Sequence, residues 1–353
     1  MSRTPRLAVL AGPDALMELR DGGLSAYQVR VLVGASGGPK WLVLRGLDRV
    51  LFPWLLRGVR EPVHAVASSI GSWRFACLCA PDPLAALERF ETAYVEQRYV
   101  GKPSPEVVSN EGARILGTFL GDGDAGSIVD HALVRLHVVT ARFRHLGAFE
   151  GVAQLAGLAL AAALNTIARP ALSGSIERVV FDAAGDPGPF APWRHLPTRH
   201  VALTRDNLVA ALSASAAIPA VMRGVRDPSG APPGVYRDGG VADYHFGEEI
   251  DPDSGLALYP HFYSHLIPGW FDKPLRSRRT RGLRRAVVLA PSDDFVASLP
   301  RAKIPDREDF STLRDDERLA AWREVVKRSD ELGDEFAELV ESGRIGRVAL
   351  PLG

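Results

Sequence analysis

The sequence predicts a layered α/β fold, and two observations support this prediction. Residues 27–34 (YQVRVLVG) and 62–69 (PVHAVASS) are short apolar runs typical of buried strands, and apolar residues recur at helical spacing between them. Strand, helix and strand within about forty residues form a βαβ unit, which implies a parallel pair of strands joined by a right-handed crossover. Strands and helices continue to alternate along the chain, as they do in layered α/β proteins.

The remaining elements follow from the same patterns. Helices are expected at residues 39–51, 84–99, 105–120, 206–218 and 316–342. Strands are expected at residues 133–143, 178–182, 200–204 and 286–290. Asp206 is expected to cap the helix that Pro219 ends. The most apolar segment, residues 151–168, contains Gln154 and Asn165 and is too short to span a bilayer, so a buried helix is expected there.

The bulk composition narrows the range of functions. The 353 residues are 46% hydrophobic and no Pro/Gly/Ser-rich linker divides them, so one domain over residues 1–353 is expected. Lys plus Arg and Asp plus Glu both total 42, and this zero net charge gives no reason to expect nucleic-acid binding. The two cysteines, Cys77 and Cys79, do not fit a disulfide framework or a metal cluster. Pro13 and Asp14 interrupt the apolar run near the N-terminus, which indicates a cytoplasmic protein.

A glycine-rich loop, Gly34–Lys40 (GASGGPK), joins the first predicted strand to the first predicted helix. Its glycines let backbone N–H groups point at a ligand without a Cβ in the way, and the helix dipole adds partial positive charge. The loop is therefore suited to a phosphate or to a developing oxyanion. A nucleotide-binding P-loop has a glycine and a hydroxyl where this sequence has Pro39 and Trp41, which argues against a nucleotide site.

A second turn, at residues 67–71 (ASSIG), follows the second predicted strand. A nucleophile elbow holds a serine on a sharp strand-to-helix turn and needs small residues two positions before and two positions after it. Ser69 has an alanine and a glycine in these positions, and the alanine is a conservative departure from the usual glycine. Ser68, the other candidate, is followed two positions later by the bulky Ile70. Ser69 is therefore the better candidate for a nucleophile.

A third turn, Asp238–Gly240 (DGG), follows a run of small residues at 213–219 (SASAAIP). An aspartate before two glycines is a common turn signal. The small residues predict a helix that can pack closely against another backbone. Ser36 and Asp243, which lie close to these motifs in the sequence, are interpreted as turn residues.

The motifs GASGGPK, ASSIG, ASAAIP and DGG occur in this order, and over residues 28–245 the sequence resembles the patatin-like phospholipase family. The resemblance implies a three-layer α/β/α sandwich with a mainly parallel central sheet. It also implies a serine acyl hydrolase that cleaves acyl esters of lipids and requires no metal or organic cofactor. Residues 250–353 lie outside the resemblance and are expected to pack on the same domain as a C-terminal extension.

Carried over position by position, the resemblance implies Ser69 as the nucleophile and Asp238 as its base. The backbone amides of Gly37 and Gly38 would form the oxyanion hole. Four further residues would support the site, the first of them as the basic residue that ends the glycine loop in the family: Lys40, Gly71, Gly239 and Gly240.

Two alternatives for the function remain open. The chain order Ser69, Asp238 and then a histidine also fits an α/β-hydrolase with a Ser-Asp-His triad. The candidates for that histidine are His245, His261 and His265. In the other alternative the protein is not an enzyme but a lipid-binding protein that retains the fold.

A basic segment, Arg276–Arg285, follows an aromatic stretch at residues 259–270. Aromatic residues beside clustered cations would suit peripheral docking on an anionic membrane surface. The alternative is a solvated, arginine-rich loop before the strand at residues 286–290.

Overall fold

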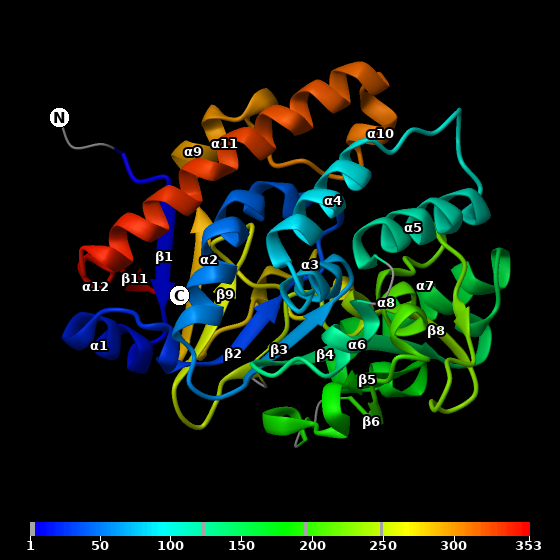
Figure 1. Ribbon diagram of the computed structural model, residues 1–353. Helices are drawn as coiled ribbons and strands as arrows, with labels where there is room; N and C mark the ends of the chain where they lie inside the picture. Colours follow the sequence, from blue (N-terminus) through cyan, green and yellow to red (C-terminus); the bar gives the residue numbers. More distant parts are fainter. Residues whose placement is uncertain (1–3, 122–123, 192, 194–195, 248–249) are drawn as a thin grey trace.

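The computed structural model describes residues 4–121, 124–191, 193, 196–247 and 250–353, whose strands form one eleven-stranded sheet (Figure 1). Nine strands follow one another in the order β11-β1-β10-β9-β2-β3-β4-β5-β6, while β8 pairs with β4 and β7 pairs with β8. The strands are β1 (Leu7–Ala11), β2 (Val29–Gly34), β3 (Val63–Ser68), β4 (Val134–Phe143), β5 (Ile176–Asp182), β6 (Thr198–Ala202), β7 (Val225–Arg226), β8 (Val235–Asp238), β9 (Leu256–Pro260), β10 (Ala286–Pro291) and β11 (Leu350–Pro351).

The centre of the sheet is parallel. β10, β9, β2, β3 and β4 all run in one direction, whereas β1 with β10, β4 with β5, and β8 with β4 and β7 are antiparallel pairs. In β2 and β3 all residues but one in each strand are buried, as expected for parallel strands covered on both faces. The predicted βαβ unit is confirmed, with β2 and β3 parallel and Gly34 opposite Ala67.

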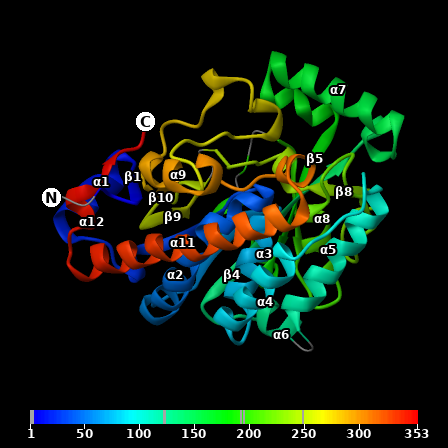
Figure 2. The ribbon, with the colours of Figure 1, turned by 90° about the horizontal axis from the view of Figure 1, so that it is seen from above.

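Helices cover both faces of the sheet. Figure 2 shows α2, α3, α4, α5 and α11 on one side and α7 on the other. The helices are α1 (Pro13–Gly22), α2 (Arg45–Gly58), α3 (Ile70–Leu78), α4 (Pro83–Val95), α5 (Pro105–Leu120), α6 (Asp124–Val129), α7 (Val152–Ile167), α8 (Leu208–Ala216), α9 (Asp293–Ser298), α10 (Asp309–Thr312), α11 (Asp315–Glu341) and α12 (Ile345–Val348). This arrangement is the three-layer α/β/α sandwich with a mainly parallel sheet that was expected.

The C-terminal residues are part of the sheet. Residues 250–353, which lie outside the family resemblance, supply β9 between β10 and β2, and they supply β10 itself. They also supply α11, whose backbone lies close against the backbone of α2. A Cβ on Gly46 would lie 2.3 Å from the Ser329 carbonyl oxygen, and the Gly46 amide donates to Ser329 Oγ at 2.9 Å. The segment therefore enters the core of the fold instead of covering it from outside.

Three local expectations were wrong. The helix expected at residues 39–51 begins as a 3₁₀ segment at Gly38–Leu44 and becomes α-helical only at α2. Asp206 does not cap α8, because Asn207 is the residue that precedes the helix. The strand β9 was not expected, and its last residues overlap the start of the aromatic stretch at residues 259–270.

The helix α7 is not buried as expected. Val152 is 83% exposed and Ile167 is 79% exposed, while the polar residues Gln154 and Asn165 are buried. Gln154 Oε1 accepts a hydrogen bond from the Ala220 amide, and Asn165 Nδ2 donates to a buried aspartate, so the polar side of this helix faces the protein. No helix in the described residues is long and apolar enough to cross a membrane.

Candidate active site

Ser69 lies on the turn between β3 and α3. Its backbone has φ 54° and ψ −130°, a left-handed conformation that is unusual for a residue with a Cβ. Two neighbours leave room for this turn. A Cβ on Gly71 would lie 2.4 Å from the Gly34 carbonyl oxygen, and a Cβ on Gly34 would lie 2.9 Å from the Ala67 methyl group. Alanine is thus accommodated at position 67 because its partner across the strands is a glycine.

Gly71→Ala is expected to lower the free energy of unfolding by about 1–3 kcal/mol, because the new methyl group would overlap the backbone of Gly34. Chemical denaturation measures this change. Gly117→Ala is the matched control, since a Cβ on this exposed helical glycine would meet no atom within 4 Å. The control is expected to keep or raise the stability by up to about 1 kcal/mol. Equal stabilities of the two variants would contradict the close approach at the turn.

The strand β4 brings Ser69 and Asp238 together. β3 pairs with β4 up to Ser68 opposite Val139, and β8 pairs with β4 from Asp238 opposite Thr140. β5 occupies the other edge of β4 over the same stretch, so β3 and β8 share one edge and meet end to end. Ser69 and Asp238 lie at this junction although 169 positions separate them in the chain.

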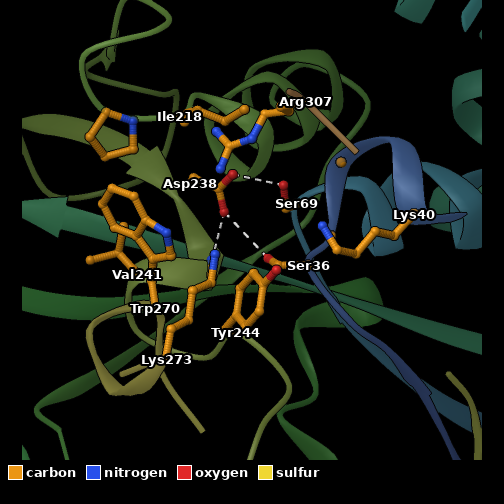
Figure 3. A pocket seen from close by; sticks show the side chains of 14 residues that line it. Ser36, Lys40, Ser69, Ile218, Asp238, Val241, Tyr244, Trp270, Lys273 and Arg307 are labelled. Atoms are coloured by element: carbon orange, nitrogen blue, oxygen red, sulfur yellow. Dashed lines mark hydrogen bonds between the residues drawn. The ribbon is translucent and has the colours of Figure 1, made fainter. Parts of the chain in front are cut away.

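Asp238 is in direct contact with Ser69 (Figure 3). Ser69 Oγ donates a hydrogen bond to Asp238 Oδ2 at 2.7 Å, and the Gly240 amide donates to Oδ1 at 2.7 Å. Ser36 Oγ makes a longer bond of 3.4 Å to the same Oδ1. These contacts hold the carboxylate in an orientation in which one oxygen faces the serine hydroxyl.

The two positions after Asp238 leave no room for a side chain. A Cβ on Gly239 would lie 2.1 Å from the Val139 carbonyl oxygen, and a Cβ on Gly240 would lie 2.2 Å from Ser36 Oγ. The D-G-G turn therefore passes against β4 on one side and the glycine-rich loop on the other. Only glycine allows both approaches without displacing a neighbour.

Burial raises the pKa of Asp238 above its usual value of 3.8. Its hydrogen bonds from Ser69 and Gly240 oppose this shift, and so do the positive charges of Arg307 and Lys273. A carboxylate that is partly desolvated is a stronger base than one in water, while these contacts keep the ionised form accessible.

The small-residue helix α8 and the residue that follows it hold Ser69 and Asp238 in place. The Ser69 amide donates to Ser215 Oγ at 2.9 Å, and Ser215 Oγ donates in turn to the Val139 carbonyl at 2.7 Å. Just beyond the helix, the Ala217 carbonyl accepts from the Asp238 amide at 3.0 Å. The alanines around Ser215 allow this approach, which explains in physical terms why small residues precede the D-G-G turn.

The glycine loop lines the same pocket as Ser69 and Asp238. Gly38 has φ 55°, which favours glycine, and in the described part of the chain neither the Gly37 nor the Gly38 amide has a recorded hydrogen-bond acceptor. Lys40 also lines the pocket, and burial lowers its pKa, an effect that Asp306 opposes. The predicted site residues of the loop are thus brought together with the serine and the carboxylate.

Several residues of the pocket were not expected from the sequence. Ser36 was interpreted as a turn residue, yet it contacts Asp238. Lys273 and Arg307 come from the part of the chain beyond the family resemblance, and no motif marks them. Asp243 is not a free turn residue either, because its carboxylate forms a buried ion pair with Arg178 at 2.6 Å.

The three candidate histidines lie elsewhere. In the region covered by the structure, no histidine lines the pocket that contains Ser69. His245 and His261 are fully buried; His245 Nδ1 accepts a hydrogen bond from the Ile267 amide, and His261 Nδ1 lies within hydrogen-bond distance of the carbonyl and the amide of Tyr263. Burial lowers the pKa of His261 to about 3, so this ring is neutral at physiological pH. In a triad the imidazole separates the hydroxyl from the carboxylate, whereas here Ser69 and Asp238 touch.

By fold and site, the chain is an α/β protein that holds a serine on a strand-to-helix turn against a buried carboxylate. No family model matches the sequence, and no curated protein matches it. Among solved structures it is similar to VipD from Legionella pneumophila, with a TM-score of 0.36 and 11% sequence identity over 95% of this chain and 72% of that chain. Its function is therefore inferred from the geometry of its own site.

Proposed function

We propose that the protein is a serine acyl hydrolase that cleaves lipid acyl esters with a Ser69–Asp238 dyad. The observation that carries this proposal is the 2.7 Å hydrogen bond from Ser69 Oγ to the Asp238 carboxylate. A serine hydroxyl is a weak nucleophile until an adjacent base takes its proton, and a carboxylate at this distance is in position to do so. The resemblance of the motifs to the patatin-like phospholipase family supports the same assignment.

In this mechanism Asp238 accepts the hydroxyl proton as Ser69 Oγ attacks the ester carbonyl. Negative charge develops on the carbonyl oxygen, and the amides of Gly37 and Gly38, which line the same pocket, would donate hydrogen bonds to it. Each such donor contributes roughly 3 kcal/mol in other acyl-transfer sites. The proton passes to the departing alcohol, and water then hydrolyses the acyl-enzyme with Asp238 again acting as base.

A cavity beside Ser69 supports a lipid substrate. It has a volume of about 570 Å³ and includes the side chains of Trp73, Ile115 and Met222 in its mostly apolar lining. Ser69 lines both this cavity and the pocket that contains Asp238. An acyl chain in the cavity would bring its ester carbon next to the serine hydroxyl.

A fluorophosphonate probe tests the proposal, because only an activated serine reacts with it. We expect labelling of the wild-type protein at Ser69, read by peptide mass spectrometry. His245→Ala, His261→Ala and His265→Ala are expected to keep both the labelling and the hydrolysis of a chromogenic acyl ester, provided that circular dichroism shows a native fold. Dependence on one of the histidines would favour the triad, and an unlabelled, folded wild-type protein would favour the non-catalytic alternative.

The basic segment Arg276–Arg285 is only partly available for a membrane. Arg278 donates to the Thr166 carbonyl at 3.0 Å, and Arg284 forms an ion pair with Asp14 at 2.7 Å. Arg285 donates to a backbone carbonyl. The guanidinium groups of three exposed arginines have no recorded hydrogen bond or ion pair within the described residues: Arg276, Arg279 and Arg281.

We propose that these three arginines and the exposed apolar side of α7 dock on an anionic membrane surface. The bond from Arg278 to Thr166 ties the basic segment to the last turn of α7, next to the exposed Ile167, and Leu155 and Leu160 are exposed farther along the same helix. From residue 152 to residue 167 this helix carries no charged residue. Apolar side chains flanked by cations match the polarity and charge of an anionic lipid interface.

Changing Arg276, Arg279 and Arg281 to glutamate is expected to weaken binding to phosphatidylserine-containing vesicles about a hundredfold, since each cation contributes about 1 kcal/mol near the surface. Vesicle co-sedimentation measures this effect. The matched control carries the same charge change on α1, α11 and α12, as Arg20→Glu, Lys327→Glu and Arg347→Glu. Equal binding of the two triple variants would contradict docking through this face.

A further inference from the structure

Three cations surround the site of the proposed dyad. Lys40, Lys273 and Arg307 line the pocket with Ser69 and Asp238, and they come from three distant segments of the chain (Figure 3). For the residues that the structure describes, no hydrogen bond or ion pair is recorded for any of these three side chains. The nearest recorded contact of the Lys273 ammonium group is the Tyr244 ring, whose centroid is 4.0 Å away.

The charges of this pocket are unbalanced. Asp238 is the one carboxylate among its described lining residues, and its oxygens already accept bonds from Ser69 and Gly240. Desolvation and the positive charges of Arg307 and Lys40 together lower the pKa of Lys273 to about 7, against the pull of Asp238. An anionic ligand would offset this repulsion.

The position of the cations relative to the apolar cavity indicates which part of a substrate they would meet. Ser69, Gly38, Ile218 and Arg307 line both the cavity and the cationic pocket. Lys40 and Lys273 line only the pocket. With an acyl chain in the cavity and its carbonyl carbon at Ser69, the alcohol portion of the ester extends toward the cations.

We propose that Lys273 and Arg307, with Lys40, form a subsite for an anionic oxygen group on the alcohol portion of the ester, so that the preferred substrates are negatively charged acyl esters. A phosphate group and a carboxylate share this chemistry. The inference rests on the proposed hydrolase function and adds the charge of the substrate to it. It differs from an effect on catalysis in general, since cations that only stabilise the oxyanion or the ionised Asp238 would accelerate neutral and anionic esters alike.

The test compares esters that share one oleoyl chain: 1-oleoylglycerol, which is neutral, its 3-phosphate, and oleoyl glycerate, which carries a carboxylate. We expect kcat/KM of the wild-type protein to be at least tenfold higher for the phosphate than for the neutral ester. Lys273→Met and Arg307→Met are each expected to remove most of this preference, because kcat/KM falls more for the anionic esters than for the neutral ester. Lys327→Met on α11 is the control. The carboxylate ester shows whether the subsite selects phosphate or any anion.

Three outcomes separate this proposal from the hydrolase assignment. Hydrolysis of the neutral ester without preference for the anionic esters would overturn the subsite and leave the hydrolase standing. An equal loss for neutral and anionic esters in Lys273→Met and Arg307→Met would also overturn the subsite. If the wild-type protein hydrolyses none of the esters, the hydrolase proposal fails, and binding of glycerol 3-phosphate by calorimetry then tests the subsite alone.

Calorimetry with the Ser69→Ala protein gives a readout without catalysis. We expect glycerol 3-phosphate to bind and glycerol not to bind, and Lys273→Met to weaken the phosphate binding at least fivefold. The groups that face Lys273 are Arg307, Lys40, Asp238 and Tyr244. Because Lys273 loses its positive charge as the pH rises through its pKa of about 7, the weakening caused by Lys273→Met is expected to be larger at pH 6 than at pH 8. Binding unaffected by both the substitution and the pH would overturn the subsite.

Discussion

Ser69→Ala is expected to lower kcat for a chromogenic acyl ester by up to about 10⁶-fold, the loss that removal of a catalytic serine causes in a serine hydrolase. This variant lacks the proposed nucleophile, so no acyl-enzyme is expected to form. The fold is expected to persist, because alanine occupies the same backbone conformation as serine and loses one hydrogen bond. That loss leaves Asp238 Oδ2 without its donor and lowers stability by about 1–3 kcal/mol.

Ser68→Ala is the control for this experiment. Ser68 is the neighbouring serine, and its hydroxyl donates to the Asp243 carbonyl at 2.7 Å instead of facing Asp238. It is expected to keep most of its activity and its fluorophosphonate labelling, with a modest loss of stability. If Ser68→Ala abolished turnover and Ser69→Ala did not, the nucleophile would be Ser68 and the proposed dyad would be refuted.

Asp238→Asn is expected to lower kcat by roughly 10²–10⁴-fold, the usual contribution of a positioned general base. The amide has the shape of the carboxylate but cannot take the proton of Ser69. Steady-state kinetics measure this loss. Only the ionised form of Asp238 would act as a base, and the pKa of this carboxyl group is raised above its usual value of 3.8. The activity of the wild-type protein is therefore expected to fall on acidification already at a pH above 3.8.

The same substitution is expected to maintain or raise stability at pH 7. The pKa of Asp238 in the folded protein is raised, so its ionised form stabilises the fold less than the protonated form does. Asparagine removes this penalty, and the gain over the wild-type protein is expected to vanish as the pH falls below 3.8, where both folded and unfolded chains are protonated. Thermal unfolding between pH 3 and pH 7 measures the difference.

Asp243→Asn provides the contrasting control, because Asp243 is also buried but pairs with Arg178. Breaking a buried ion pair from one side costs about 3–5 kcal/mol. This variant is therefore expected to lose stability, whereas Asp238→Asn is expected to lose activity without losing stability. A loss of stability in both variants would contradict the predicted effect of Asp238→Asn on the fold.

The sequence indicated the features that depend on local sterics. The turn at Ser69 and the D-G-G turn were visible because close backbone contacts restrict neighbouring positions to small residues, and such restrictions appear as motifs. The βαβ unit was visible because its strands are continuous apolar runs. The meeting of Ser69 with Asp238 was expected from the order of the motifs, while its cause, the register of β3 and β8 on β4, is not readable from one sequence.

Other features depend on tertiary placement and left no local pattern. Lys273 and Arg307 reach the pocket from loops near η9 (Trp270–Asp272) and α10, where surface cations look the same as functional ones. The orientation of α7 was misjudged for a related reason. Its apolar composition predicts burial, but two polar side chains, Gln154 and Asn165, are bound by the protein and turn the apolar residues outward.

The shared edge of β4 makes the site sensitive to a sequence change that never contacts a substrate. Val139 and Thr140 are adjacent residues of β4, and they pair with the last residue of β3 and the last residue of β8. One extra residue between them would move the two strand ends apart by roughly 3.3 Å, the rise of a single strand residue, which is more than a hydrogen bond tolerates. An insertion there is expected to separate the serine from the carboxylate although neither residue is changed.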